Sequence, residues 1–71
     1  MRITILTKKD YYALITLGPD ESVRSYNGRD DVLVENFYET AEEALLDYRK
    51  AVHVSDLRGW RVAHEGDRNW G

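Results

Sequence analysis

The 71-residue sequence has no cysteine, one proline and two histidines, and each scarcity excludes a class of structure or chemistry. Without cysteine there is no disulfide framework and no thiolate nucleophile. The five glycines are scattered and form no phosphate-binding loop. No apolar run approaches the ~18 residues that a membrane-spanning helix needs. The chain starts with Met and runs directly into strand-like sequence, so we expect a single small α+β domain, residues 1–71, in the cytoplasm.

Candidate catalytic and metal-binding residues are scarce as well. His53 and His64 are the only histidines, whereas a metal site needs three or four converging ligands. No serine lies in the sequence context of an activated nucleophile. Carboxylates are plentiful, but acid–base catalysis needs two of them in unlike environments, one of them desolvated. We therefore expect no enzyme, no metal and no cofactor.

A helix over residues 41–53 is the clearest element in the sequence. Thr40 is placed to cap its N-terminus, and Glu43 completes the pattern of a capping box. Apolar residues recur at helical spacing and form one stripe, namely Ala41, Ala44, Leu45, Tyr48 and Val52, widened by Ala51. The opposite face is charged. The helix is thus expected to cover a sheet with one side and to meet water with the other.

Strand patterns precede this helix. Residues 2–7 alternate, with Ile3 and Ile5 on one face and Thr4 and Leu6 on the other. Residues 11–17 are apolar on both faces, which is typical of a central strand. Which of the adjacent tyrosines at positions 11 and 12 faces the helix is left open by this pattern.

Three further stretches are strand candidates, two clear and one weak. Residues 31–38 and 59–64 read as strands, residues 22–26 as a weaker candidate, and residues 65–67 as a turn. Asn27-Gly28 predicts a type I′ hairpin turn. The sequence therefore predicts a two-layer α+β fold: a three- to five-stranded, mainly antiparallel sheet with one helix packed on one face, in the order β-β-β-α-β. One helix cannot cover both faces, so the other face must be polar or covered by another chain.

A set of carboxylates, here called the acidic run, occupies residues 30–47 without any Lys or Arg among them. Its members are Asp30, Asp31, Glu35, Glu39, Glu42, Glu43 and Asp47. A nucleic-acid-binding protein normally carries a basic surface instead. A concentrated acidic surface suits a basic partner. The alternative, left open by the sequence, is a solvated helix face next to a solubilising edge strand.

Several aromatic and apolar residues are candidates for anchoring such a partner. Phe37, Tyr48 and Trp60 are expected in the core. Tyr26, beside the Asn-Gly turn, and Trp70, near the C-terminus, have no evident core role, and tyrosine and tryptophan commonly anchor interfaces. Leu46 lies on the helix flank, off the core stripe. We expect these last three to contribute apolar contacts, although for Trp70 folding back on the sheet edge is the slightly favoured alternative.

Two families resemble this layout. The stretch Phe37-Tyr38-Glu39-Thr40-Ala41-Glu42-Glu43-Ala44, a helix start after strands, is similar to the arm-type DNA-binding domains of phage integrases. Those domains are rich in Lys and Arg, whereas here Lys8-Lys9 is the one adjacent basic pair in the predicted sheet and the third strand is acidic. In size, layout, acidity and lack of cysteine, the whole chain resembles small phage-encoded inhibitors of bacterial defence, the anti-CRISPR proteins. That resemblance implies a DNA-mimicking inhibitor in the cytoplasm of a bacterial host cell.

The leading hypothesis is thus a non-enzymatic protein that binds a basic, nucleic-acid-handling host complex through the acidic run and does not bind nucleic acid itself. Two alternatives remain. One is a small nucleic-acid-binding module that uses the sheet face, with a tyrosine for stacking and a basic set on phosphates: Lys8, Lys9, Arg24, Arg29, Arg58 and Arg61. The other is a homodimeric structural or accessory protein that pairs its open sheet face.

Overall fold

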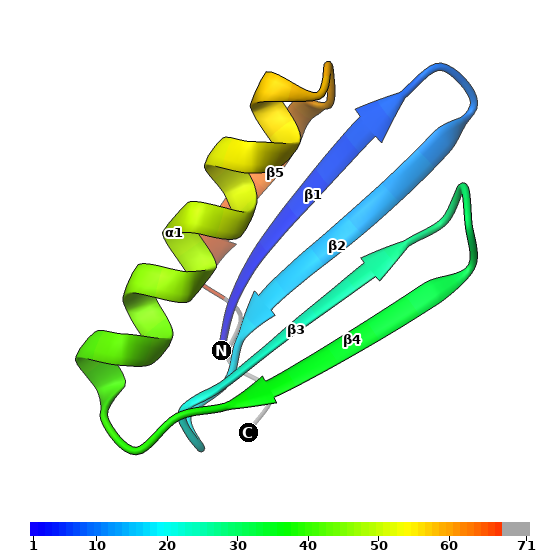
Figure 1. Cartoon of the computed structure of the whole chain (residues 1–71). Helices are drawn as coiled ribbons and strands as arrows, with labels where there is room; N and C mark the ends of the chain where they lie inside the picture. Colours follow the sequence, from blue (N-terminus) through cyan, green and yellow to red (C-terminus); the bar gives the residue numbers. More distant parts are fainter. Residues whose placement is uncertain (68–71) are drawn as a thin grey trace.

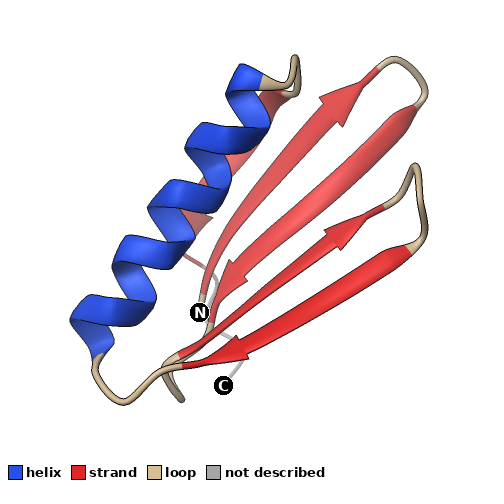
Figure 2. Cartoon of the chain, in the orientation of Figure 1, coloured by secondary structure: helices blue, strands red, loops and turns tan. Residues whose placement is uncertain are grey.

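Residues 1–67, which the computed structural model describes, form a five-stranded antiparallel sheet with one helix on one face (Figures 1 and 2). The elements in chain order are β1 (Arg2–Lys8), β2 (Tyr11–Leu17), β3 (Ser22–Asn27), β4 (Val32–Phe37), α1 (Ala41–Leu57) and β5 (Arg61–Asp67). Their order in the sheet is β4-β3-β2-β1-β5. The helix therefore carries the chain from one edge of the sheet to the other.

The predicted α+β class and the antiparallel pairing are confirmed, but the element order is β-β-β-β-α-β. The weak candidate around residues 22–26 is a full strand, because pairing with β2 and β4 on both sides satisfies its backbone. β2 occupies the centre of the sheet, as its two-sided apolar pattern predicts. The last strand begins after Trp60, and residues 65–67, expected as a turn, pair with β1.

The helix begins as predicted and ends later. The Thr40 hydroxyl accepts the Glu43 backbone N–H at 3.2 Å, which confirms the cap; the Glu43 carboxylate contacts the same hydroxyl rather than the Thr40 backbone N–H. The predicted end at residue 53 is wrong, since α1 continues to Leu57. Residues 54–57 contain no helix breaker, and the helix stops where Gly59 takes a positive φ of 93°.

The core lies between α1 and the central strands. Thr4 and Leu6 of β1 are fully buried, with Ile3 and Ile5 on the opposite, open face, as the alternation predicts. The remaining core residues come from β2, β3, α1 and the residue before β5: Ala13, Ile15, Val23, Ala44, Tyr48 and Trp60. Within the predicted helical stripe, Leu45, Ala51 and Val52 are half-buried and Ala41 is exposed. The stripe is narrower than predicted because a single helix meets the sheet along one line of contact.

The β3–β4 hairpin is closed by four residues, 28–31, so the predicted two-residue type I′ turn is wrong. The residue with a positive φ is Asp31, at 54°, and the Asn27 side chain accepts the Arg29 backbone N–H. Gly28 matters for a different reason. Its N–H donates to the Tyr12 carbonyl at 2.8 Å, and a Cβ at this position would lie 2.5 Å from that oxygen.

The face of the sheet opposite α1, here called the open face, is mixed: an apolar row crosses it, and Thr7, Thr16, Arg24, Glu35 and Arg61 share it by register. Because directly paired residues of antiparallel strands share a face, the strand registers place one row across all five strands: His64, Ile5, Leu14, Tyr26 and Leu33. Tyr12 lies on this face next to Tyr26, with ring centroids 6.2 Å apart, and Tyr11 lies on the helix side. The prediction for Phe37 was wrong, since its side chain is 64% exposed and not in the core.

Candidate functional site

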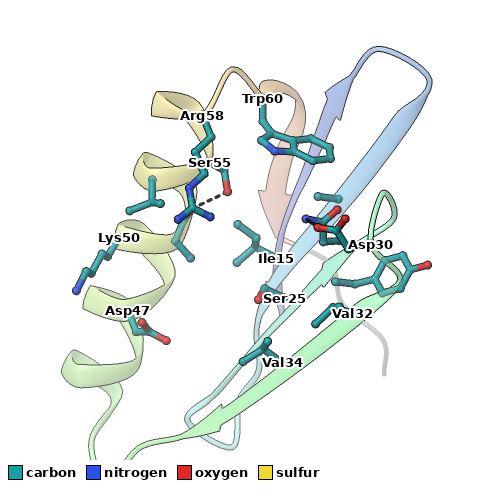
Figure 3. A pocket seen from close by; sticks show the side chains of 15 residues that line it. Ile15, Ser25, Asp30, Val32, Val34, Asp47, Lys50, Ser55, Arg58 and Trp60 are labelled. Atoms are coloured by element: carbon teal, nitrogen blue, oxygen red, sulfur yellow. Dashed lines mark hydrogen bonds between the residues drawn. The ribbon is translucent and has the colours of Figure 1, made fainter.

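A groove of about 430 Å³ lies between α1 and the β3–β4 part of the sheet (Figure 3). It exists because α1 packs mainly against β2, β3 and β5 and leaves β4 largely uncovered. Val32 and Val34 of β4 point to the helix side of the sheet and stay 49% and 45% exposed. The remaining apolar lining is Ala13, Ile15, Ala51, Val54 and Trp60.

Charged residues stand around this apolar groove. Asp30 of the hairpin and Asp47, Lys50 and Arg58 of the helix side line it. In Figure 3 the Asp47 carboxylate is directed toward the sheet, whereas the Lys50 side chain extends away from it. Carboxylates therefore face the groove from the hairpin, at Asp30, and from α1, at Asp47.

The structure divides the acidic run into two ends joined by β4. At the hairpin end, Asp31 accepts the Tyr26 hydroxyl at 2.9 Å and Asp30 accepts the Asn27 side-chain amide at 3.3 Å. The hydrogen bond to Asp31 is the main reason that the pKa of Tyr26 lies above its ordinary value. On β4, Glu35 accepts from Arg24 at 3.0 Å on the open face.

At the other end, Glu39, Glu42, Glu43 and Asp47 lie on the link to α1 and on its first turns. The structure brings two of them together at Tyr38. A hydrogen bond to the Asp47 carboxylate chiefly raises the pKa of the Tyr38 phenol, with partial burial and the charges of Asp47 and Glu43 adding to it. Glu39 and Glu42 are exposed. The acidic run is thus a border that follows β4 from the hairpin to the helix, not one flat acidic face.

The predicted anchoring residues are not brought together. Tyr26 is half-buried on the open face and engaged with Asp31. Leu46 is exposed on the outer side of α1. Trp70 lies outside the described residues. What the sequence reading missed is the apolar part of β4, where Leu33 is 57% exposed. A signal was present, because residues 32–37 contain no Lys, Arg or Pro, the residues that usually protect an edge strand.

The basic set is dispersed rather than gathered on the sheet face. Lys8 donates to the Arg58 carbonyl at the end of α1, at 2.7 Å. Arg24 is paired with Asp20 and Glu35 and lies over the Phe37 ring. By register, Arg61 shares the open face with Arg24, at the other side of the sheet. Nothing in this arrangement forms a continuous basic track for a phosphate backbone.

Within residues 1–67, no three His, Asp or Glu side chains converge as metal ligands. The same residues include no helix long and apolar enough to cross a membrane. Comparison of the chain with protein-family models, with curated proteins and with solved structures finds no match.

Proposed function

We propose that this chain is a non-enzymatic protein-binding protein that engages a basic surface of its partner through the acidic run. In its most specific form, it inhibits a nucleic-acid-handling complex of a bacterial host by occupying the basic groove that normally holds the nucleic acid. The observation that carries the proposal is the acidic run, which borders β4 at both ends: residues 30–47 hold seven carboxylates and no Lys or Arg, and Glu35 is the one on β4 itself.

The surroundings of the acidic run support a protein partner. Carboxylates steer association with a basic surface, but stable complexes also need a desolvated apolar centre. The exposed Leu33 and Phe37 and the apolar groove lie beside the acidic run and can provide it. The dispersal of the basic set argues against the nucleic-acid-binding alternative.

The experiment that tests the proposal combines capture with displacement. Proteins retained from a bacterial lysate by the immobilised chain would be purified and loaded with fluorescein-labelled duplex or single-stranded DNA. The chain is expected to release that DNA, because both compete for the same Lys/Arg groove, and to give no anisotropy change with DNA alone at physiological salt. A retained partner that keeps its DNA at saturating chain would argue against inhibition. Direct, steeply salt-dependent binding of DNA to the chain would favour the nucleic-acid alternative.

A second candidate, a homodimer through the open face, is favoured by the apolar row across the sheet. Uncovered apolar patches of this kind commonly mark association surfaces. Leu14 lies at the centre of that row, half-buried on β2. If two copies pair here, Leu14→Lys should shift the chain from dimer to monomer in sedimentation velocity at micromolar concentration. Leu46→Lys, on the outer side of α1, should leave the distribution unchanged. A parent chain that is monomeric throughout would exclude the homodimer.

A further inference from the structure

The two edges of the sheet differ in how well they are protected. β5 pairs with β1 through a bulge, since Ile5 pairs with His64 and Leu6 with Val62, leaving Ala63 without a partner. β5 also carries charged residues along its length, among them Arg61, Glu65 and Asp67. Bulges and charges are the usual means of preventing edge-to-edge pairing. This edge is therefore disfavoured for pairing with another strand.

β4, the opposite edge in Figure 1, has no bulge and a single charged residue. All of its six residues are exposed, its register with β3 is unbroken, and Glu35 is its one charged residue. Its apolar side chains border both faces of the sheet, Val32 and Val34 at the groove and Leu33 and Phe37 on the open face.

The hydrogen-bond pattern between β3 and β4 shows which backbone N–H and C=O groups of β4 have no partner in the sheet. The Tyr38 N–H donates to the Glu21 carbonyl at 2.9 Å, so position 38 faces β3. Because hydrogen-bonded pairs alternate along an antiparallel ladder, positions 36, 34 and 32 face β3 as well. The N–H and C=O groups of Leu33, Glu35 and Phe37 therefore point away from the sheet.

A second copy of the chain meets this edge with like charges in some registers only. In an antiparallel self-pairing centred on Glu35, the two Glu35 side chains face each other, and a centre at Leu33 places Asp31 opposite Glu35, whereas a centre at Val34 places Leu33 opposite Glu35. Like charges directly opposite each other destabilise a strand pair. A segment with basic residues meets the same carboxylates favourably, with Glu35 then shared between the segment and Arg24.

We propose that β4 is a strand-addition site for an extended, basic segment of the partner protein. The segment lies antiparallel to β4 and exchanges backbone hydrogen bonds with Leu33, Glu35 and Phe37. Alternate side chains then fall on the two faces. Apolar ones enter the groove over Val32 and Val34, and basic ones lie on the open face beside Glu35, within reach of Asp31. This inference rests on the proposed function and specifies how the basic partner is bound.

The probe is a synthetic peptide of alternating lysine and valine, about one residue longer than the six of β4. In amide exchange followed by NMR, the peptide is expected to protect Leu33, Glu35 and Phe37, whose N–H groups otherwise face solvent. The lysines of the peptide lie on the open face, directly opposite Leu33, Glu35 and Phe37. Because those residues direct their backbone groups outward, each exchanges hydrogen bonds with the lysine opposite it, and the lysine N–H groups of the peptide are the ones that face β4. N-methylation of the lysines should therefore weaken binding at least about tenfold, and N-methylation of the valines should not.

Leu33→Pro provides the matching change in the chain. It removes an outward N–H and leaves the β3 ladder intact, so it should weaken peptide binding at least about tenfold. Leu33→Ala keeps the N–H and controls for the lost side chain. The methylated peptides test the unaltered chain and do not depend on the proline variant folding.

The outcomes separate this inference from the proposed function. Binding that depends on the peptide's charge but is equal for the two methylated peptides, without amide protection, would overturn strand addition and leave an acidic surface for a basic partner. No binding of the peptide would overturn strand addition alone, since the lysate capture tests the acidic run independently. Protection of the same three amides without peptide, rising with chain concentration, would identify a second copy as the occupant and overturn the basic segment.

Discussion

Replacing Tyr48 by alanine is expected to destabilise the protein severely, up to unfolding it at ambient temperature. Tyr48 is among the most buried side chains, at 1% exposure, and it stands between α1 and β1. Truncating a buried aromatic residue to alanine costs about 3–5 kcal/mol. Domains have about 0.05–0.15 kcal/mol of stability per residue, so a chain of 71 residues loses much or all of its margin.

Urea unfolding followed by circular dichroism measures this loss, and three companion variants show which contacts account for it. Leu46→Ala, on the exposed side of the same helix, should stay within about 0.5 kcal/mol of the parent. Tyr48→Phe keeps the ring but removes the hydrogen bond with the Thr4 hydroxyl, which is fully buried, at a cost of about 1–3 kcal/mol. Adding Thr4→Val to Tyr48→Phe should recover part of that cost. A Tyr48→Ala variant as stable as Leu46→Ala would show that the core is assigned to the wrong side of α1.

Tyr48 also links stability to alkaline pH. Burial raises the pKa of its phenol above the ordinary value, with the Thr4 hydrogen bond opposing that shift. The folded state therefore favours the neutral phenol, and this contribution is complete below the unfolded-state pKa of about 10. It is lost as pH rises through the folded-state pKa. The urea midpoint should accordingly fall above about pH 10, and less steeply in Tyr48→Phe than in the parent.

The elements that the sequence predicts well are those in which local preference and burial agree. Thr40 caps a helix whose stripe includes Tyr48, and the alternation at Thr4 and Leu6 matches a one-sided core. The late helix end has no local signal before Gly59. The Asn-Gly pair indicates a turn, but the required positive φ falls on Asp31 because the hairpin closes over four residues.

The candidate site is harder to predict because it depends on strand order. The exposure of Phe37 and Val34 follows from the edge position of β4 and from the place of α1 over other strands. Periodicity assigns residues to a face but does not say whether anything covers that face. The same limit applies to the acidic run, whose sequence continuity suggests one surface, whereas Glu35 lies on the open face and Asp47 at the groove.

Reversing the charge of Glu42, Glu43 and Asp47 to lysine is expected to abolish binding of the captured partner. The three changes take the net charge from −3 to +3 and convert attraction into repulsion at the start of α1. At up to about 1 kcal/mol for each exposed charge contact, the loss approaches 100-fold or more. The fold should persist because Glu42 and Glu43 are exposed and Asp47 is half-buried at the groove, although the contact of Glu43 with Thr40 makes Glu43→Gln the cleaner single change.

The matched control moves the same charge change to another place. Asp10, Asp56 and Asp67 are exposed carboxylates outside the acidic run, and reversing them to lysine also gives a net charge of +3. If location matters, this control should retain most of the affinity, losing only the long-range part that salt screens beyond about 8 Å. Equal losses of affinity in the two variants, measured by titration of the captured partner, would show that the acidic run acts only through the net charge of the chain. Undiminished binding of the first variant would show that the acidic run is only a solvated surface, and the apolar row of the open face around Leu14 would then become the binding surface to test.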